Sequence, residues 1–256
     1  MRDFTEAVYA ELLDVALREE YAFLTVREYL LRETLPDRFV VVRHDIDRKP
    51  RNALSLARIE ALRDVRTTYY VRTEPDVFDP DVVTRLAELG HEVGYHYEDL
   101  DRADGDRAAA LDSFESQLAR VRRLVDVDTV CMHGNPLTSH DNRDMWGDPP
   151  EFDAFDLLGE AYLSMDFEDV TYFSDTGRTW RDGPLKVKDH TMGEGEKTVQ
   201  VDSTRELIRL LREDEVDRLC LLVHPDRWSS STAEHLSQSV KDAAVNAAKY
   251  GIQAVR

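Results

Sequence analysis

The stretch Phe39-Val40-Val41-Val42-Arg43-His44-Asp45-Ile46-Asp47 begins as a β-branched apolar run and ends in groups that bind metals and move protons. An apolar run of this kind is typical of a strand that is buried on both faces of a parallel sheet. Asp45 and Asp47 then begin either an active-site loop or, in the simpler interpretation, a turn that caps the next helix. The segment therefore predicts a buried strand whose carboxyl end carries acids.

Strands alternate with helices around this segment. We expect further strands at 67–71, 91–96, 129–132 and 219–223, weaker ones at 161–165 and 170–173, and helices at 52–64, 81–89, 106–124 and 203–213. This alternation indicates an α/β fold with a parallel sheet that is closed, or nearly closed, as a (β/α) barrel. We expect one domain over 1–256, with a helix at 5–31, the barrel core at 38–228 and a closing helix at 232–249.

The chain is strongly acidic: its net charge is −19, and only six of its 33 basic residues are lysine. Scattered carboxylates repel one another unless salt screens them, so we interpret the composition as a halophilic surface adapted to a salt-rich cytoplasm; an ordinary acidic protein is the alternative. A field of this sign disfavours nucleic acid and anionic membranes as partners. Neither a membrane-spanning apolar run nor a secretory signal is seen, so we expect a cytoplasmic location.

Cys131 and Cys220 each lie in an apolar run, which predicts buried thiols rather than a disulfide.

Groups that suit catalysis follow five of the predicted strands. They are His44, Asp45 and Asp47 after the first strand, His96 and Glu98 after the third, His133 after the fourth, Asp175 after the sixth, and His224 and Asp226 after the last. Because the carboxyl ends of barrel strands converge on one face, we expect these side chains to share a pocket. Carboxylate and imidazole ligands suit Zn²⁺ first, and also Mn²⁺, Co²⁺ or Fe²⁺. The pattern predicts activation of water beside a divalent metal ion.

Three of these segments resemble motifs of the NodB-like polysaccharide deacetylases. Arg43-His44-Asp45-Ile46-Asp47 is similar to the first motif, Gly90-His91-Glu92-Val93-Gly94-Tyr95-His96 to the second, and Leu222-Val223-His224 to the closing one. The resemblance implies a distorted seven-stranded barrel of the glycoside hydrolase and deacetylase type. It also implies that Asp45 is the general base, that Asp47 and His96 bind the metal, and that His224 is the general acid.

The chain departs from that pattern, as a divergent branch would. Ile46 separates two aspartates that are adjacent in the family, and Leu100 stands where a second metal-binding histidine usually follows. We infer that His133 supplies the missing ligand. The family's Arg-x-Pro element is also absent, so Arg43, Arg143 or Arg178 is expected to replace the arginine that orients the base.

The remaining candidates have two interpretations each. Asp175 is either a catalytic pocket residue or a turn aspartate. His44 and Glu98 either orient the ligands through hydrogen bonds without touching the metal or contact the substrate. Trp228 either stacks on a sugar ring or packs in the core.

The leading hypothesis is a metal-dependent hydrolase of a carbon–nitrogen amide bond that deacetylates an N-acetylated sugar or a glycan precursor. The alternative is a catalytically inactive barrel that binds a saccharide or nucleotide-sugar during glycan assembly. A third hypothesis is hydrolysis of a small amide that is not a sugar. The oligomeric state is not predicted.

Overall fold

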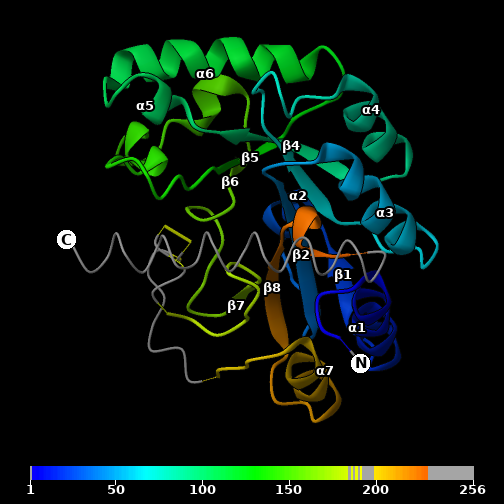
Figure 1. Ribbon diagram of the computed structural model, residues 1–256. Helices are drawn as coiled ribbons and strands as arrows, with labels where there is room; N and C mark the ends of the chain where they lie inside the picture. Colours follow the sequence, from blue (N-terminus) through cyan, green and yellow to red (C-terminus); the bar gives the residue numbers. More distant parts are fainter. Residues whose placement is uncertain (1, 184–185, 187, 190, 192–198, 230–256) are drawn as a thin grey trace.

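The computed structural model describes residues 2–183, 186, 188–189, 191 and 199–229. The expected helix at 232–249 lies outside these residues. The described chain is α/β, and all its strands pair in parallel within one curled sheet (Figure 1). The strands are β1 (Ala22–Leu24), β2 (Phe39–Ile46), β3 (Thr68–Val71), β4 (Glu92–Tyr97), β5 (Thr129–Met132), β6 (Gly159–Glu160), β7 (Thr171–Ser174) and β8 (Arg218–Val223).

Seven of the strands form a half-barrel, which confirms the expected (β/α) barrel, and their order is β6-β5-β4-β3-β2-β8-β7. The eighth strand, β1, pairs with the first residues of β2, from Phe39 to Val41, whereas β3 pairs with its last residues, from Arg43 to Ile46. β2 is therefore the centre of the sheet and is buried along its whole length. It extends to Ile46, four residues beyond the apolar run, so Arg43 and Asp45 lie within the strand.

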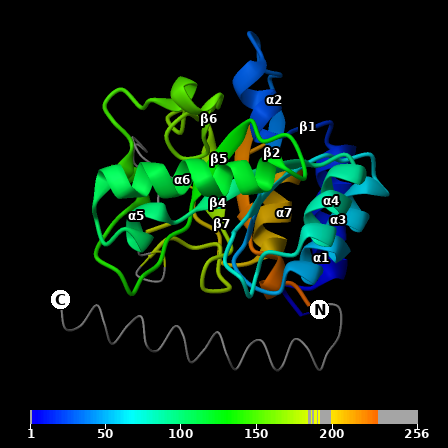
Figure 2. The same ribbon diagram turned by 90° about the horizontal axis from the view of Figure 1, so that it is seen from above.

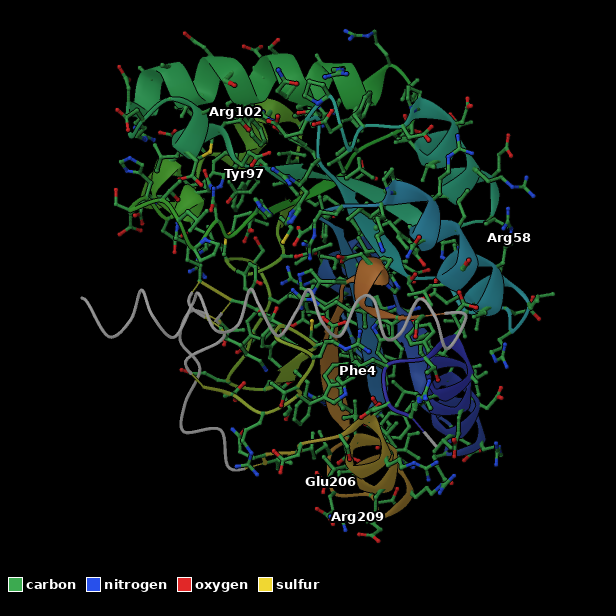
Figure 3. All side chains as sticks on the ribbon, in the orientation of Figure 1. Phe4, Arg58, Tyr97, Arg102, Glu206 and Arg209 are labelled. Atoms are coloured by element: carbon green, nitrogen blue, oxygen red, sulfur yellow. The ribbon has the colours of Figure 1, made fainter. Side chains whose placement is uncertain are left out.

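Helices cover the outer face of the curled sheet (Figures 1 and 2). They are α1 (Glu6–Arg18), α2 (Val26–Leu31), α3 (Pro50–Ala61), α4 (Pro80–Glu88), α5 (Asp99–Arg102), α6 (Arg107–Arg122) and α7 (Thr204–Arg212), with short 3-10 helices η1 (Asn142–Met145), η2 (Phe152–Phe155) and η3 (Pro225–Arg227). Figure 3 shows the basic side chains of Arg58 and Arg209 on the outside, whereas Phe4 and Tyr97 are buried. Among the described helices, none has the length and apolarity that crossing a bilayer requires.

The prediction of one helix over 5–31 is wrong. Helix α1 ends at Arg18, and Glu20 adopts a left-handed backbone (φ 60°) that turns the chain into β1. Thr25 then starts α2 with a capping box, in which its side chain accepts from the Glu28 amide and the Glu28 carboxylate accepts from the Thr25 amide. Two caps and a turn thus divide a segment whose apolar spacing looks continuous.

The prediction of a strand at 161–165 is also wrong, because β6 ends at Glu160. The buried Glu160 carboxylate accepts hydrogen bonds from the amides of Tyr162 (2.6 Å) and Leu163 (2.9 Å), which folds the following residues into a turn. This turn brings the Tyr162 hydroxyl within 3.2 Å of the Tyr172 hydroxyl. Both tyrosines also donate to Asp189, so side chains bridge the two edges of the sheet, β6 and β7.

A buried carboxylate, Glu60 of α3, ties the helices to the outer face of the sheet. It accepts hydrogen bonds from Tyr9 of α1, from Thr67 (3.0 Å) and Tyr69 (2.7 Å), and lies 2.7 Å from His44 Nε2. Burial alone would raise the pKa of Glu60, but His44 and the hydroxyl donors outweigh it and lower the pKa below its ordinary value. Because four donors surround one buried anion, this network stabilises the packing of the helices against the sheet.

Glu60→Gln should lower the free energy of unfolding by about 3 kcal/mol, because an amide cannot accept from all of these donors and leaves buried groups unpaired. Urea unfolding at neutral pH measures the loss. The matched control is Glu88→Gln, in an exposed ion pair with Arg85, which should cost less than about 1 kcal/mol. Because the folded pKa of Glu60 is depressed, its contribution should be full above its unfolded pKa and lost as the pH falls through the folded value. Equal losses for the two variants at neutral pH would contradict the account.

Candidate functional site

The carboxyl ends of β2, β4, β5 and β8 meet at one rim of the half-barrel. Residues facing the interior alternate along β2, so Arg43, Asp45 and Asp47 share a side and His44 takes the opposite one. Across the sheet, His44 pairs with Val223, which places His224 beside Asp45. A cavity of about 180 Å³ opens at this rim, and the residues that line it include Asp45, Asp47, His96, His133 and His224.

Three candidate metal ligands converge at this cavity. Asp47 Oδ1 lies 3.0 Å from His133 Nδ1 and 3.3 Å from His96 Nε2, and the two imidazole nitrogens are 3.3 Å apart. Ligand atoms held about 2.0–2.1 Å from a tetrahedral zinc ion lie about 3.3 Å from one another. The three atoms therefore fit a single ion without rearrangement, and the two histidines supply nitrogen from different strand ends.

The hydrogen bonds around His96 fix which of its nitrogens faces that centre. Its Nδ1 lies 3.0 Å from the backbone carbonyl oxygen of Cys131 and must carry the proton, because a carbonyl can only accept. The Nε2 lone pair then points toward Asp47 and His133. Histidine ligands of metals are commonly oriented in this way.

Hydrogen bonds also fix the positions of the other two candidate ligands, His133 and Asp47. The amide of His133 donates to the Tyr97 carbonyl (2.7 Å), directly beyond His96 on β4. Glu98 forms a two-pronged ion pair with Arg72, at 2.6 Å and 2.8 Å, and Arg72 donates to the backbone carbonyl of Asp47 (3.1 Å). Glu98 thus acts on the site through Arg72, as a supporting residue.

The charge of Asp47 is stabilised by its surroundings. Burial would raise the pKa of Asp47, but the neighbouring imidazoles, above all that of His133, hold it well below its usual range. An ionised carboxylate between imidazoles is a site that a divalent cation completes.

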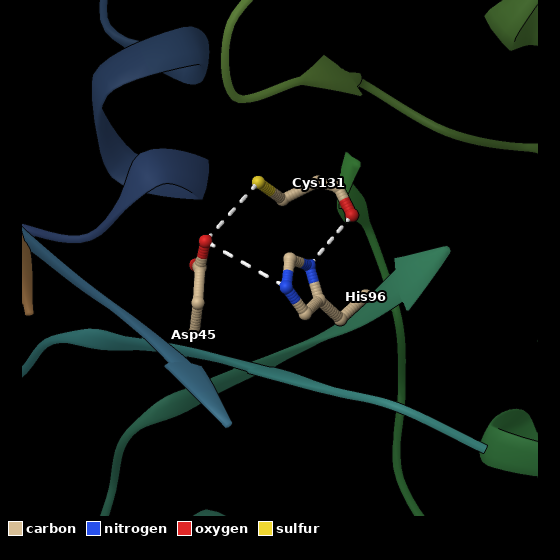
Figure 4. A group of neighbouring side chains, drawn as sticks. All are labelled: Asp45, His96 and Cys131. Carbon is tan, nitrogen blue, oxygen red and sulfur yellow. Dashed lines mark hydrogen bonds and ion pairs between the residues drawn. The ribbon is translucent and has the colours of Figure 1, made fainter. Parts of the chain in front are cut away.

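A second group, Asp45, His96 and Cys131, also brings ligand atoms together (Figure 4). The Cys131 thiol lies 4.0 Å from Asp45 Oδ2, and His96 Nε2 lies 3.7 Å from the same oxygen. Burial raises the pKa of this thiol well above its ordinary value, and Arg43 Nη1 lies 2.6 Å from the sulfur. Only a thiolate binds metal, and the positive guanidinium of Arg43 repels a metal cation. Asp47, His96 and His133 are therefore the better set of candidate ligands. Both cysteines are free and buried, as the sequence predicts.

Asp45 lies beside the candidate metal ligands and has a carboxylate oxygen without a hydrogen-bond partner in the described chain. Its side chain is buried and lines the cavity, and its Oδ1 atom has no hydrogen-bond partner in the described chain. A buried carboxylate oxygen of this kind needs a proton donor such as water or substrate. The guanidinium of Arg43, 4.0 Å from Asp45 Oδ2, is the nearby buried cation. It also contacts Tyr162, with its guanidinium 4.0 Å from the ring centroid.

His224 is oriented by Asp175. The Asp175 carboxylate accepts from the His224 backbone amide (3.0 Å) and lies 2.7 Å from His224 Nδ1, while Arg227 and Trp228 Nε1 bind the same carboxylate at 2.8 Å. Burial and Arg227 lower the pKa of His224, but Asp175 more than offsets them and raises it. His224 Nε2 lies 3.7 Å from Oδ2 of Asp47, one of the candidate metal ligands. This pairing suits a histidine that carries and donates a proton.

Some candidates lie away from the cavity. His44 binds Glu60 on the outer face of the sheet and stacks on Tyr69, so the carboxylate it supports is not in the pocket. Asp175 is fully buried behind His224 and is not among the described residues that line the cavity, so it is a positioning residue rather than a catalytic one. Trp228 is buried and packs against Phe4 and Tyr9, which agrees with the second of its two interpretations, packing in the core.

Of the three arginines proposed to orient the base, only Arg43 lies beside Asp45 among the described contacts. Arg143 binds Asp141 at 2.6 Å, and Arg178 lies over the ring of Phe4.

Sequence reasoning missed several residues that line the cavity, namely Arg48, Tyr162, Lys188, Asp189 and Arg227. Arg48 and Arg227 directly follow recognised motifs, so motif proximity was an available signal. Lys188 and Asp189 belong to an irregular segment with no periodicity. Asp189 accepts from Ser174, Tyr162 and Tyr172, and this contact holds the segment at the rim.

Comparisons with known proteins find neither a matching family model nor a matching curated protein. Among solved structures, the chain is similar to the deacetylase PplD of Streptococcus pyogenes (TM-score 0.43, 13% identity, 57% of this chain and 70% of that one). It is also similar to PdaA of Bacillus subtilis, a family 4 carbohydrate esterase, with a TM-score of 0.42 and 14% identity over 91% of this chain and 82% of that one. A pseudoenzyme of that family from Bacillus anthracis matches as well, with a TM-score of 0.39 and 13% identity over 84% of this chain and 66% of that one.

The first of these structures is described as a deacetylase, the second as a family 4 carbohydrate esterase and the third as a pseudoenzyme of that family. Since every TM-score is below 0.5, the function has to be judged from the residues of the site.

Asp175→Asn should lower the pKa of His224 by about one unit or more, because burial and Arg227 then act without the opposing carboxylate. An NMR titration of the imidazole in chelator-treated protein measures the change, with Asp153→Asn, an exposed aspartate, as control. In the parent protein, the stability from protonated His224 is full below its unfolded pKa of 6.5 and is lost as the pH rises through the raised folded value. An unchanged His224 pKa in Asp175→Asn would show that the pairing with Asp175 does not set the protonation of His224.

Proposed function

We propose that the protein is a metal-dependent hydrolase of a carbon–nitrogen amide bond and that it removes an acetyl group from an N-acetylated sugar or glycan precursor. The observation that carries the proposal is the convergence of Asp47, His96 and His133 within 3.0–3.3 Å of one another, with Asp45 and His224 each 3.7 Å from one of their side chains. A buried carboxylate with a partnerless oxygen and an aspartate-bound histidine, both next to a set of metal ligands, are the parts that amide hydrolysis needs.

Asp47, His96 and His133 would hold the ion, and Zn²⁺ suits one carboxylate and two imidazoles best, with Mn²⁺, Co²⁺ or Fe²⁺ as alternatives. When bound, a divalent cation lowers the pKa of water and polarises an acyl oxygen. The site fits such an ion because its three ligand atoms already face one centre, while His96 is held in the required tautomer by the Cys131 carbonyl.

Asp45 would take the proton of the attacking water. Its side chain lines the cavity, and its buried Oδ1 atom has no hydrogen-bond donor in the described chain, so this carboxylate has an acceptor that is not in use. Arg43 limits the mobility of this carboxylate and offsets its charge from within the barrel.

His224 would give a proton to the leaving nitrogen. Asp175 accepts the proton of its Nδ1 and favours the protonated imidazole, in which Nε2 carries a second proton on the side of the cavity. Asp45 and His224 lie on the adjacent strands β2 and β8, so base and acid are fixed to one rigid sheet.

The cavity sets the size of the reacting group. At about 180 Å³ it holds roughly six waters, which suits an acetamido group and part of a sugar ring. The remainder of a saccharide would extend from the rim. The net charge of −19 agrees with a saccharide rather than a nucleic acid as the partner.

A second candidate is a catalytically inactive saccharide-binding barrel. It is favoured by Leu100, a buried residue of α5 at the position where the resemblance places another metal-binding histidine. Elemental analysis separates the two candidates, because the hydrolase needs about one ion per chain after dialysis and the inactive binder needs none.

Asp47→Ala, His96→Ala and His133→Ala should each reduce the metal content from about one ion per chain to near zero, because two remaining ligands bind weakly. Cys131→Ser is the matched control and should keep the metal. Metal analysis of folded, dialysed protein decides. If Cys131→Ser loses the ion and His133→Ala keeps it, the other ligand set is correct.

Asp45→Asn should lower kcat for acetate release from an N-acetylated sugar by about 10²–10⁴-fold while leaving the metal content unchanged. The reason is that an amide cannot accept the proton of the attacking water. Asp144→Asn, an exposed aspartate, should retain the parent rate. A full rate in Asp45→Asn would remove this residue from the mechanism.

A further inference from the structure

The rim of the cavity carries basic side chains in a protein with 52 acidic and 33 basic residues. Arg48, Lys188 and Arg227 all line the cavity, and Lys49 and Arg51 follow Arg48 on the same turn. Arg227 is committed to Asp175, and Lys188 donates to Thr138 Oγ1 (2.8 Å) and to the His140 carbonyl. Arg48 is the most exposed of the cations that line the cavity, with half of its side chain accessible.

Helix α3 begins against the usual electrostatic preferences. Its N-cap, Lys49, adopts a left-handed backbone (φ 48°) and makes no side-chain cap hydrogen bond, and its first turn contains no acidic residue. Cations at a helix N-terminus are unfavourable, because the helix dipole is positive there. Departures of this kind from local preference are often found where function requires them.

Asp226 positions the guanidinium of Arg48, which still has N–H groups that can bind a ligand. Its Nη2 atom lies 2.9 Å from Asp226 Oδ2, which is buried, but that oxygen has no hydrogen-bond partner in the described chain. The contact is therefore an ion pair whose N–H groups do not point at the carboxylate. Asp226 fixes the place of the guanidinium, and the accessible half of the Arg48 side chain leaves donors for a ligand at the cavity that Arg48 lines.

We propose that the substrate is an acylated sugar bearing an anionic group, a carboxylate or a phosphate, and that Arg48 binds this group at the rim while the acyl group enters the cavity. This inference rests on the proposed hydrolase function. Arg48 directly follows the metal ligand Asp47, so an anion held by its guanidinium lies next to the reacting centre. Guanidinium donors match the geometry of both anions.

The test compares three probes on the full, zinc-loaded chain at fixed ionic strength: N-acetylglucosamine, its analogue oxidised to a C6 carboxylate, and its 6-phosphate. Calorimetric binding is measured beside acetate release, so that a failure of hydrolysis is separate from a failure of recognition. We expect the parent protein to bind at least one anionic probe about tenfold or more tightly than the neutral sugar. The stronger of the two identifies the anion.

Arg48→Gln should abolish this preference without weakening binding of the neutral sugar, and Arg48→Lys should restore part of it. Arg51→Gln is the matched control, because Arg51 is 80% exposed, pairs with Asp79 and does not line the described cavity; it should keep the preference. Equal binding of all three probes by the parent protein would overturn the proposal. An equal loss for neutral and anionic probes in Arg48→Gln would also overturn it, since Arg48 would then act only by holding Asp226.

Discussion

The candidate site depends on the register of four neighbouring parallel strands. Tyr70 of β3 is level with Asp45 of β2 and with Gly94 of β4, so two residues further along Asp47 and His96 are level, and Cys131 of β5 lies beside His96. A slip of one residue in any pairing would turn a ligand to the outer face. Gly94 permits this register, because a Cβ there would lie 2.6 Å from the Thr129 carbonyl oxygen and would also collide with the Tyr70 ring.

The two faces of β2 have different roles: the outer face stabilises the fold, and the inner face carries residues of the candidate site. On the outer face His44 joins a buried network around Glu60 that ties α1 and α3 to the sheet. On the inner face Arg43 and Asp45 lead to Asp47 at the rim. A charged inner face is tolerable in a buried strand only where each charge has a nearby counter-charge or lines a cavity, in which the proposed ion and substrate would supply one. The stability of the outer network and the position of the inner ligands are therefore properties of the same strand.

Much of the fold and site was predictable, because strand ends in a parallel sheet converge and because Asp45, Asp47, His96, His133 and His224 each follow a clear apolar run. Strand alternation alone could also have placed His44 on the opposite face from Asp45. Other features depend on contacts between distant residues. Nothing local distinguishes Asp175 as the partner of His224, since that pairing is set by β7 and β8 lying side by side. The place of Asp189 depends on hydroxyls from both edges of the sheet, and the break between α1 and α2 depends on capping that apolar spacing conceals.

The central claim is that these strand ends bind one ion through Asp47, His96 and His133. Anomalous diffraction at the zinc edge from crystals of the metal-loaded protein tests it most directly. The account predicts one peak, about 2.0–2.2 Å from Asp47 Oδ1, His96 Nε2 and His133 Nδ1. A peak at the Cys131 sulfur instead, or none at the rim of the barrel in protein shown to contain metal, would contradict it.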